Sequence, residues 1–334
     1  MTRRFVARPD WYLSASPDPL PATGAPLRWG VVATGNISTT VTRDLALLED
    51  SVLQAVSSRS AASAAAFAER FGFATSYGDD GDDGAARGFE RLARDPDVDV
   101  VYIGTPHASH HEVALAALRA GKHVLCEKAL TINAREAKDL ITAAKESGVF
   151  LMEAVWARFV PGMQRAFEIV ASGEIGEVQW VRADLGFPAT YDPTSRLWAP
   201  ADGGGALLDI TVYPLLWAWG TLGRPDSATA AGALTDLGVD SQNVLTLGYR
   251  SGAAAQLISS LTAAGPRTAT VAGTKGYLEN IGSLNNPSGL RIRTGRDDVR
   301  DEHFEPVGAG YTYQLREVTR CIQQGLAESP TMPP

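Results

Sequence analysis

The chain has little cysteine. Its 334 residues include two cysteines, Cys126 and Cys321, which lie far apart in the sequence. Two cysteines are too few for a disulfide framework, and no C-x-x-C pair is present that could bind zinc or carry out thiol redox chemistry. The cysteine content therefore predicts a protein of a reducing compartment, and we expect a cytoplasmic location.

Long apolar runs and basic runs are also absent. No apolar stretch reaches the length of about 18 residues that a membrane-spanning helix needs. The net charge is −8, and no Lys/Arg-rich segment offers a footprint for a nucleic-acid backbone. Arg3-Arg4 resembles the start of a twin-arginine export signal, but no apolar segment follows it, and residues 1–26 have the proline-rich composition of an extended arm. We therefore expect neither nucleic acid nor a membrane as a partner.

The length and the 45% hydrophobic content are sufficient for two domains. Residues 27–155 alternate between apolar strand patterns and amphipathic helix patterns, which predicts an α/β domain with a doubly wound parallel sheet. The expected strands are 27–33, 52–57, 98–103, 123–126 and 149–152, and the expected helices are 38–48, 61–71, 111–120 and 134–147. Such sheets bind ligands beyond the carboxyl ends of their strands.

Residues 156–334 have a different pattern, with short strands joined by tight turns. This pattern predicts a separate α+β domain with a large, open, mostly antiparallel sheet. The expected strands are 178–185, 227–235, 244–249, 253–260, 267–272 and 290–294, and the expected helices are 161–172, 207–222 and 313–326. The predicted organisation is therefore an arm over residues 1–26, a first domain over 27–155 and a second domain over 156–334.

The loop after the first expected strand reads Ala33-Thr34-Gly35-Asn36-Ile37-Ser38. It stands where a Gly-x-Gly-x-x-Gly turn would place a pyrophosphate on a helix N-terminus. Only Gly35 remains of the three glycines, and it is the one that allows the backbone to approach a phosphate. Glycine between a strand and a helix is common, but the position of this loop at the start of a βαβ unit favours a dinucleotide.

The second expected strand ends with Ser58-Arg59-Ser60. An NAD site would have Asp or Glu near this point to hold the ribose 2′-hydroxyl, and no acid is present. The forked, charged guanidinium of Arg59, with hydroxyls on both sides, suits a 2′-phosphate. The sequence therefore predicts NADP(H) rather than NAD(H), and the alternative is that Arg59 is a solvated loop residue.

Two further segments contain residues with catalytic chemistry. The strand at 123–126 runs into Glu127-Lys128, which places a lysine where a cofactor and a substrate would meet, although a surface ion pair is an alternative. Gly203-Gly204-Gly205 precedes the helix expected at 207–222, where Asp209 and Tyr213 are four residues apart and would share one face. An exposed Asp209 and a core Tyr213 are the alternative there.

Three histidines, His107, His110 and His111, cluster after Pro106. A metal site usually needs a further carboxylate or thiolate, and the neighbouring sequence offers only Glu112. We therefore expect no metal.

Five segments together resemble the Gfo/Idh/MocA oxidoreductase family, and most closely its branch of dimeric dihydrodiol dehydrogenases and NADP-dependent xylose or glucose dehydrogenases. They are residues 30–37, 99–106, 120–128, 152–159 and 204–214. The resemblance spans residues 27–330. It implies a Rossmann domain that binds NADP(H), a substrate-binding domain whose open sheet often forms a homodimer, and hydride transfer between nicotinamide and a carbinol or carbonyl carbon.

The resemblance also implies roles for individual residues. Tyr213 would exchange a proton with the substrate oxygen, the Lys128 ammonium would favour the phenolate of Tyr213, and Asp209 would orient the substrate. The implied cofactor contacts are Ala33, Thr34, Gly35, Asn36, Ile37, Ser58, Arg59, Ser60, Thr105, Pro106, His110, Glu127 and Lys128. The implied substrate contacts are Trp156, Arg158, Phe159, Asp209 and Tyr213. For Arg158, core packing or an ion pair between domains is an equal alternative.

The chain departs from the family pattern at two places. Ala129 follows Glu127-Lys128 where the family usually has proline, which leaves the turn freer and the direction of Lys128 open. Relatives usually continue beyond a segment like Glu328-Ser329-Pro330 with another helix, so we expect a terminal helix to be missing.

The predicted function is an NADP(H)-dependent oxidoreductase that acts on a small-molecule sugar or vicinal diol, in a homodimer or higher homo-oligomer. Two alternatives remain open. One is a reductase of ketosugars, possibly nucleotide-linked, in biosynthesis, and the other is a non-catalytic NADP-binding sensor on the same fold.

Overall fold

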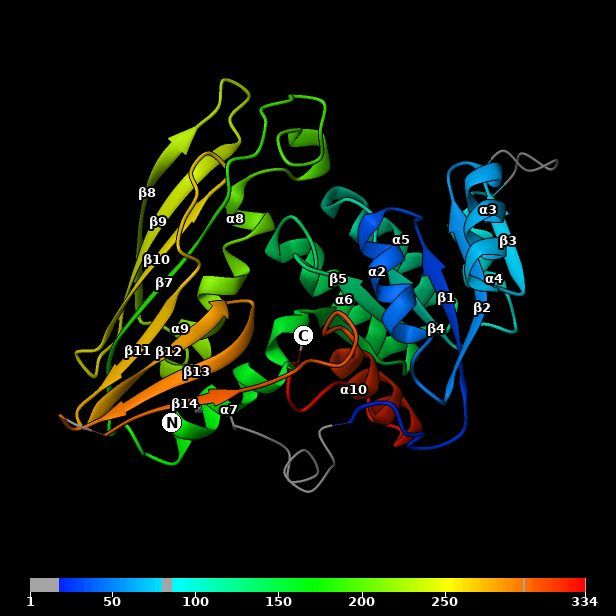
Figure 1. Cartoon of the computed structure of the whole chain (residues 1–334). Coiled ribbons are helices and arrows are strands. Elements are labelled where there is room, and N and C mark those ends of the chain that lie inside the picture. Colours follow the sequence, from blue (N-terminus) through cyan, green and yellow to red (C-terminus); the bar gives the residue numbers. More distant parts are fainter. Residues whose placement is uncertain (1–17, 80–85, 297, 334) are drawn as a thin grey trace. The chain divides into compact units, whose positions relative to one another are not determined.

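The computed structural model describes residues 18–79, 86–296 and 298–333, and these residues form two sheets (Figure 1). The sheets belong to two compact units. The antiparallel-sheet unit consists of Ala157–Pro306, and the parallel-sheet unit consists of the described residues up to Trp156 together with those from Val307 onward. Residues 1–17 of the predicted arm lie outside the described residues. The domain boundary after residue 155 stays a prediction, and the structure adds that the chain after Val307 packs with the parallel sheet.

The parallel sheet has the strand order β3-β2-β1-β4-β5-β6 in the described part of the chain, and every neighbouring pair is parallel. Its strands are β1 Leu27–Val32, β2 Ser51–Ser58, β3 Thr75–Gly78, β4 Val100–Ile103, β5 His123–Glu127 and β6 Leu151–Ala154. This order confirms the predicted doubly wound sheet. The chain reverses direction across the sheet between β1 and β4, and such switch points are where open α/β sheets bind ligands.

The parallel-sheet unit also contains helices, some of which have identifiable capping residues at their ends. They are α2 Asn36–Leu45, α3 Ala61–Phe71, α4 Gly88–Arg94, α5 His107–Arg119, α6 Ala134–Ser147 and α10 Thr312–Gln323. Asn133 caps α6 by accepting the backbone N–H of Glu136 at 3.0 Å, and Gly148 ends it with φ of +66°. Helix α5 begins four residues earlier than the sequence pattern predicted, because Pro106 supplies an extended residue suited to the N-cap.

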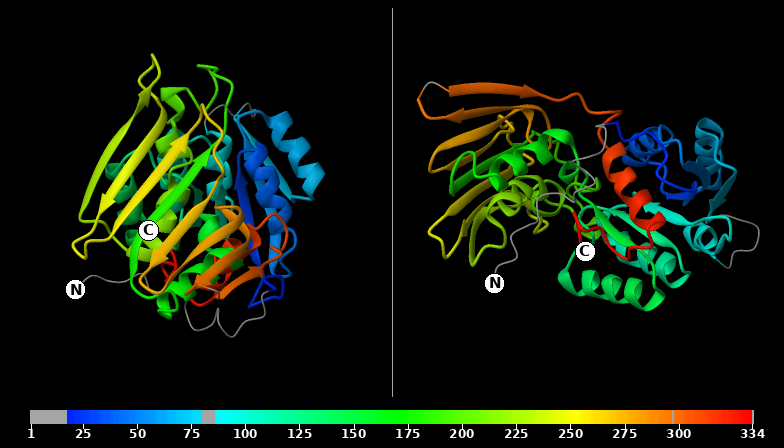
Figure 2. Two further views of the ribbon diagram at one scale, coloured as in Figure 1. Left: turned by 60° about the vertical axis from the view of Figure 1, so that its left-hand side comes forward. Right: turned by 90° about the horizontal axis from the view of Figure 1, so that it is seen from below.

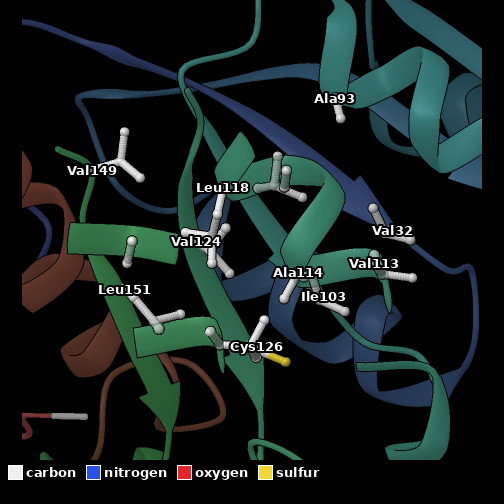
Figure 3. Close-up of a cluster of buried hydrophobic side chains, with 14 of the residues drawn as sticks. Val32, Ala93, Ile103, Val113, Ala114, Leu118, Val124, Cys126, Val149 and Leu151 are labelled. Carbon is white, nitrogen blue, oxygen red and sulfur yellow. The ribbon is translucent and has the colours of Figure 1, made fainter. Parts of the chain in front are cut away.

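One face of the parallel sheet packs against α4, α5 and α6 to form a hydrophobic core (Figure 3). Strand residues of this core include Val32, Ile103, Val124 and Leu151, all almost fully buried. Fully burying a side chain of this size stabilises a fold by about 1.5–3 kcal/mol. Cys126 lies in the same core, where burial raises the pKa of its thiol, so it acts as a packing residue.

The C-terminal segment is fixed to the parallel-sheet unit by two carboxylates. Asp44 on α2 accepts the backbone N–H groups of Ala309 and Tyr311 at 2.9 and 2.8 Å, just before α10 begins. On α10, Arg316 forms a buried ion pair with Asp50 at 2.8 Å. Burial alone would raise the pKa of Asp50, but the hydrogen bond from Arg316 holds this pKa below its ordinary value. The segment therefore belongs to the parallel-sheet unit.

The second sheet has the order β14-β13-β12-β11-β7-β10-β9-β8 among the described residues. Neighbouring strands are antiparallel except β7 and β10, which are parallel, so the predicted mostly antiparallel sheet is confirmed. The strands are β7 Val178–Gly186, β8 Ser227–Leu234, β9 Asp240–Gly248, β10 Ala254–Ser260, β11 Ala269–Gly273, β12 Gly276–Ser283, β13 Asn286–Thr294 and β14 Asp298–His303. The sequence pattern missed β12 and β14. The strand β14 is a highly charged edge strand without the alternation that predicts a half-buried strand.

Helices cover one face of this second sheet. Helix α7 Pro161–Ala171 packs on β13, and helix α9 Val212–Leu222 packs on β7, β10 and β11. Short helical segments lie at η1 Trp156–Arg158, η2 Pro200–Asp202 and α8 Ala206–Asp209. The left view of Figure 2 shows the opposite face, which none of the described helices covers. None of the helices in the described part of the chain has the length and apolarity needed to cross a bilayer.

The helix predicted over residues 207–222 is interrupted, and this corrects the expectation that Asp209 and Tyr213 share one helix face. Helix α8 ends at Asp209, and α9 begins at Val212. The cause is Pro214, which has no N–H to donate to the carbonyl of Ile210 and whose ring would clash with that carbonyl in a continuous helix. Ile210 accordingly leaves the helical conformation, with φ of −125°.

Candidate functional site

The strand register brings the ends of four strands of the parallel sheet into one row. Val32 on β1 pairs with Ser57 on β2 and with Ile103 on β4, and Ile103 pairs with Cys126 on β5. The loops that follow these four residues therefore leave the sheet side by side at its carboxyl edge. They contain the predicted cofactor residues around Gly35, Arg59, Thr105 and Lys128.

The loop after β1 is shaped to receive an external group. Ala33, in place of the first glycine of the motif, adopts φ of +86°, a left-handed conformation that costs a non-glycine residue about 1–2 kcal/mol. Gly35 is the N-cap of α2, with an ordinary φ of −76°, and a Cβ placed on it would meet no protein atom within 4 Å. Neither conformation nor internal packing demands glycine there. The open space leaves room for a phosphate at the N-terminus of α2, which no side chain caps.

The end of β2 lies against this loop. The Thr34 hydroxyl is 3.4 Å from the Ser58 hydroxyl, so the two predicted cofactor residues meet. Arg59 is exposed, and no carboxylate pairs with it within residues 18–79, 86–296 and 298–333. Ser60 caps α3 by accepting the backbone N–H of Ser63 at 3.3 Å. The guanidinium of Arg59 is therefore exposed at the end of β2, whereas the Ser60 hydroxyl already has a structural partner.

The loop after β4 also fits a bound group. The Thr105 hydroxyl is buried and has no hydrogen-bond partner among the residues that the structure describes. Buried hydroxyls are normally hydrogen-bonded, so such an atom at a sheet edge is consistent with a ligand contact. Together with the open space at Gly35, this hydroxyl shows that the residues present fit a dinucleotide.

The turn that carries Lys128 is held at four consecutive residues. Tyr102 donates to the Glu127 carboxylate at 2.9 Å, and His107 Nε2 lies 3.1 Å from the carbonyl oxygen of Lys128. The next two contacts are His110 Nδ1 to the carbonyl oxygen of Ala129 at 2.8 Å, and the backbone N–H of Leu130 to Glu153 Oε1 at 2.9 Å. The Lys128–Ala129 peptide bond is cis. Neighbouring side chains thus anchor a turn in which proline is absent.

His110 connects two of these loops. Its Nε2 lies 2.9 Å from the carbonyl oxygen of Thr105, while its Nδ1 contacts the turn at Ala129. Burial lowers the pKa of His110 to about 4, so the ring is neutral at pH 7 and carries one N–H. The side chain exposes no surface. In this structure His110 acts on the site through the loops it joins, and a direct contact with the cofactor stays a prediction.

Two carboxyl groups flank Lys128 in the parallel-sheet unit. Burial raises the pKa of Glu127 to about 7, against the opposing effects of the Lys128 charge and the Tyr102 hydrogen bond. Burial also raises the pKa of Glu153, again opposed by the hydrogen bond from Leu130 and the charge of Lys128. The Lys128 ammonium therefore lies in a polar, partly dehydrated setting, unlike a simple surface ion pair.

The other two predicted catalytic residues lie in the antiparallel-sheet unit. The side chain of Asp209 is 7% exposed and forms an ion pair at 3.0 Å with Arg196, whose side chain is 57% exposed. Tyr213, near the start of α9, is also buried. Asp209 is thus a buried carboxylate with a solvent-facing cation beside it, which contradicts the alternative of an exposed acid.

The three residues predicted to begin the substrate site are deeply placed. Trp156 stacks on Tyr311 with ring centroids 4.6 Å apart. The guanidinium of Arg158 lies 4.7 Å from the centre of the Phe167 ring, and the residue is 1% exposed. Phe159 is also 1% exposed. For Arg158 the structure shows core packing, and substrate contacts by these three residues stay predictions.

Sequence reasoning missed four residues that contact the candidate site, namely Tyr102, His107, Glu153 and Arg196. A signal existed for Glu153, because it is an acid inside the apolar strand β6. His107 was noticed only as part of a histidine cluster. Arg196 lies in a loop between β7 and α8 and has no local pattern to distinguish it.

The comparisons with known proteins agree with this geometry. Residues 27–155 match the family model described as oxidoreductase family, NAD-binding Rossmann fold, and residues 163–279 match the C-terminal domain of the same family. The chain belongs to the Gfo/Idh/MocA oxidoreductase family. This confirms the resemblance recognised in the sequence, and with it an oxidoreductase fold that binds a nicotinamide dinucleotide.

Two curated relatives are trans-1,2-dihydrobenzene-1,2-diol dehydrogenases. The mouse (Mus musculus) enzyme is 35% identical over 317 residues, with 92% of this chain and 91% of that protein covered. The human (Homo sapiens) enzyme is 33% identical over the same length and coverage. This chain is therefore similar to dihydrodiol dehydrogenases along nearly its whole length.

Two solved structures share the fold of this chain with sequence identities of 27% and 28%. The aldose-aldose oxidoreductase from Caulobacter crescentus complexed with glycerol has a TM-score of 0.81 and 27% identity, with 92% of each chain covered. A 3-ketoreductase from Actinomadura kijaniata in complex with NADP and TDP-benzene has a TM-score of 0.77 and 28% identity, with 90% of each chain covered. This chain therefore shares its fold with an aldose-aldose oxidoreductase and with a 3-ketoreductase that binds NADP.

Proposed function

We propose that the protein is an NADP(H)-dependent dehydrogenase or reductase that transfers hydride at a CH–OH carbon of a sugar or a vicinal diol. The observation that carries this proposal is the carboxyl edge of the parallel sheet, where the Gly35 loop, Arg59 and the anchored Lys128 turn emerge together. The relatives support it, since those named above act on a dihydrodiol, an aldose and a 3-ketosugar.

The cofactor preference rests on Arg59. An exposed guanidinium without a carboxylate partner among the described residues, at the end of the second strand, suits the 2′-phosphate of NADP(H). The strand ends on Ser58 and offers no acid that could accept a hydrogen bond from the 2′-hydroxyl of NAD(H). The residues that would hold the cofactor are Thr34, Gly35, Asn36, Ile37, Ser58, Arg59, Thr105 and Pro106.

The protein's own residues would manage the proton and the charge. When bound, the nicotinamide ring supplies the hydride donor or acceptor. Tyr213 exchanges a proton with the substrate oxygen, and Lys128 stabilises negative charge on that oxygen and on the phenol. Asp209, which forms an ion pair with Arg196 at 3.0 Å, accepts hydrogen bonds from substrate hydroxyls. Trp156, Arg158 and Phe159 would shape the substrate site from the start of the second domain.

Reduction of a nucleotide-linked ketosugar is the second candidate function. It is favoured by the similarity to the 3-ketoreductase whose structure holds NADP and TDP-benzene. The physical requirements at the reacting carbon are the same, so Lys128 and Tyr213 would keep their roles. The two candidates differ in the substrate and in the direction of hydride transfer.

A homo-oligomer through the open face of the antiparallel sheet is part of the proposal. Trp180, Val244 and Ile258 lie on this face and are 47%, 41% and 43% exposed. Ile258 pairs with Val244 across β10 and β9, so these two apolar side chains are neighbours, and Trp180 on β7 pairs with Ala254 further along β10. A face of this kind fits a second copy of the chain, and light scattering of wild type and of Trp180→Glu would show a dimer and a monomer respectively. We also propose a cytoplasmic location, from the cysteine content alone.

The test of the activity is absorbance at 340 nm with NADP⁺ or NADPH and a panel of trans-dihydrodiols, aldoses and ketosugars. We expect turnover with at least one diol or aldose, and faster turnover with NADP⁺ than with NAD⁺. Turnover only with nucleotide-linked ketosugars would favour the second candidate. Tight NADPH binding without turnover on any of them would instead indicate a sensor and overturn the proposal.

The test of the cofactor preference is Arg59→Ala. Loss of a charge-assisted contact to the 2′-phosphate should weaken NADPH binding by about 10- to 100-fold while NADH binding is unchanged. Arg43→Ala, at the far end of α2, serves as a matched control. Equal or tighter binding of NADH by the wild-type protein would show that Arg59 has no such role.

A further inference from the structure

Four side chains hold the turn that carries Lys128, and one of them, Glu153, differs from the other three. Tyr102, His107 and His110 contact the turn through a hydroxyl or a ring nitrogen, whereas Glu153 contacts it through a carboxyl group, which can carry charge. Glu153 lies on β6, in register with Cys126 on β5. Its side chain therefore reaches the turn from the neighbouring strand and ends at Leu130, two residues beyond Lys128.

The contact with Leu130 fixes the backbone on the far side of the lysine. The N–H of Leu130 donates to Glu153 Oε1 at 2.9 Å, and the side chain of Leu130 is buried in the hydrophobic core. His107 and His110 hold the carbonyl groups of the two residues in between. Lys128, Ala129 and Leu130 thus each have a backbone group in contact with a side chain from another element, and these contacts hold the backbone from which the lysine side chain extends.

The charges around Lys128 also include Glu153. The Lys128 charge lowers the pKa values of both Glu127 and Glu153, and Glu153 in turn raises the pKa of Glu127. The groups that face this cluster are Glu127 and Lys128 from β5 and its turn, Tyr102 from β4, His107 and His110 from α5, and Glu153 from β6. Among these groups, the charges of Lys128 and Glu153 act on Glu127, and the charge of Lys128 acts on Glu153.

We propose that Glu153 is a positioning residue for Lys128, which holds the lysine turn through Leu130 and places a carboxylate beside the ammonium group. Its hydrogen bond replaces part of the rigidity that a proline at Ala129 would provide. When ionised, its carboxylate favours the protonated form of Lys128, whose ammonium can stabilise negative charge during the reaction. The proposal rests on the proposed function for its catalytic meaning, but its structural content can be tested without turnover.

Substitution by glutamine separates the two effects. Glu153→Gln keeps an oxygen that can accept the Leu130 N–H and removes the charge, whereas Glu153→Asp keeps the charge and shortens the reach to Leu130. Glu146→Gln on the exposed face of α6 is the matched control. Each variant is first compared with wild type by thermal unfolding, and Glu153→Asp gives the answer if Glu153→Gln fails to fold.

The first readout is the pH dependence with which a lysine-reactive reagent labels Lys128 in the protein without added cofactor, measured by mass spectrometry. Removing a neighbouring carboxylate makes loss of the proton easier, so labelling in Glu153→Gln should move to lower pH by roughly one unit. Glu153→Asp should keep the wild-type labelling profile, and so should Glu146→Gln. The proposal would be overturned if the labelling profile of Glu153→Gln did not shift. It would also be overturned if Glu153→Asp, which keeps the charge, shifted as far as the neutral variant Glu153→Gln.

The second readout is steady-state kinetics with NADPH affinity measured separately by fluorescence. We expect kcat to fall about tenfold in both Glu153 variants, because the lysine is misdirected or less charged, while the Kd for NADPH changes less than about threefold. In Glu153→Gln the alkaline limb of the kcat profile should also move to lower pH, because Lys128 loses its proton more easily. If labelling shifted in Glu153→Gln but the wild-type protein turned over no substrate, the positioning role would stand and the proposed function would be rejected. Normal kcat in both variants of an active enzyme would reject the positioning role.

Discussion

The turn around Lys128 and the segment around Tyr213 are built differently. Four neighbouring side chains hold residues 127–130, and the turn ends in a hydrophobic core. The segment with Asp209 and Tyr213 is a broken helix, and an exposed loop arginine, Arg196, supplies the ion pair at its acid. The Lys128 turn is thus held by side chains from neighbouring elements, whereas the acid near Tyr213 is paired with a residue of a loop.

This difference matches the tasks that the two regions would perform. A residue that serves the cofactor always meets the same ligand, so a fixed turn is suitable. Residues that meet the substrate vary in what they must fit, and loops on a stable sheet can vary without damage to the core. The named relatives are a dihydrodiol dehydrogenase, an aldose-aldose oxidoreductase and a 3-ketoreductase, which is the variation in substrate expected of the second region.

The largest effect should come from the substrate half, with Tyr213→Phe. Loss of the phenolic proton removes general acid–base catalysis, so turnover should fall by about 10²- to 10⁴-fold while the Kd for NADPH stays unchanged. The matched control is Tyr249→Phe, because the hydroxyl of Tyr249 is buried and has no partner among the described residues. Near-wild-type turnover of Tyr213→Phe would remove this residue from the mechanism.

A smaller effect should follow from Arg196→Met, which tests how far the substrate half depends on its loop. Asp209 would then be a buried carboxylate without its cation, so its interaction with substrate hydroxyls should weaken and KM should rise about tenfold. The control is Arg224→Met, since Arg224 is also exposed and lies beyond α9 in the same unit. Kinetics of the two variants with one substrate make the comparison. If Arg196→Met and the control Arg224→Met had the same KM and the same kcat, Arg196 would have no part in the site.

In the cofactor half, Glu127→Gln should change stability with pH. The pKa of Glu127 is raised from 4.5 to about 7 in the folded protein, so the folded state holds the proton more tightly than the unfolded state. This contribution to stability is complete below about pH 4.5 and is lost as the pH rises through about 7. Glu127→Gln should therefore be more stable than wild type at pH 8, on the order of 1 kcal/mol, and equal to it near pH 4.5.

Thermal unfolding of wild type, Glu127→Gln and the exposed control Glu146→Gln at both pH values measures this difference. A stability difference that is independent of pH would show that Glu127 is ionised in the ordinary way. The substitution should also reduce activity, because it removes a charge beside Lys128.

The smallest effect concerns the loop after β1. Ala33→Gly should stabilise the protein by about 1 kcal/mol, because glycine adopts the observed φ of +86° without the steric cost that alanine has. Ala120→Gly is the control, since Ala120 has φ of −82° and gains nothing from glycine. Urea denaturation at pH 7 gives both free energies of unfolding. A loss of stability in Ala33→Gly similar to that in Ala120→Gly would mean that residue 33 is not strained.

The sequence predicted the cofactor half better than the substrate half. Gly35, Arg59 and Lys128 each follow a strand with a clear apolar pattern, and parallel strands place their carboxyl ends together. The break between Asp209 and Tyr213 was missed although Pro214 was visible, because a proline acts on the carbonyl four residues before it. Glu153 and His107 could not be assigned locally, since their contacts depend on strand register and on where α5 begins. The packing of α10 against Asp44 and Asp50 depends on contacts across more than 260 residues.

We propose that Lys128 and Tyr213 serve one reaction. The most direct test is a double-mutant cycle with Lys128→Met, Tyr213→Phe and the double variant, in which kcat is measured with saturating NADP⁺. Residues that act together on one transition state have strongly non-additive effects. We predict that the double variant is about as slow as the slower single variant. Multiplication of the two single effects in the double variant would contradict the account.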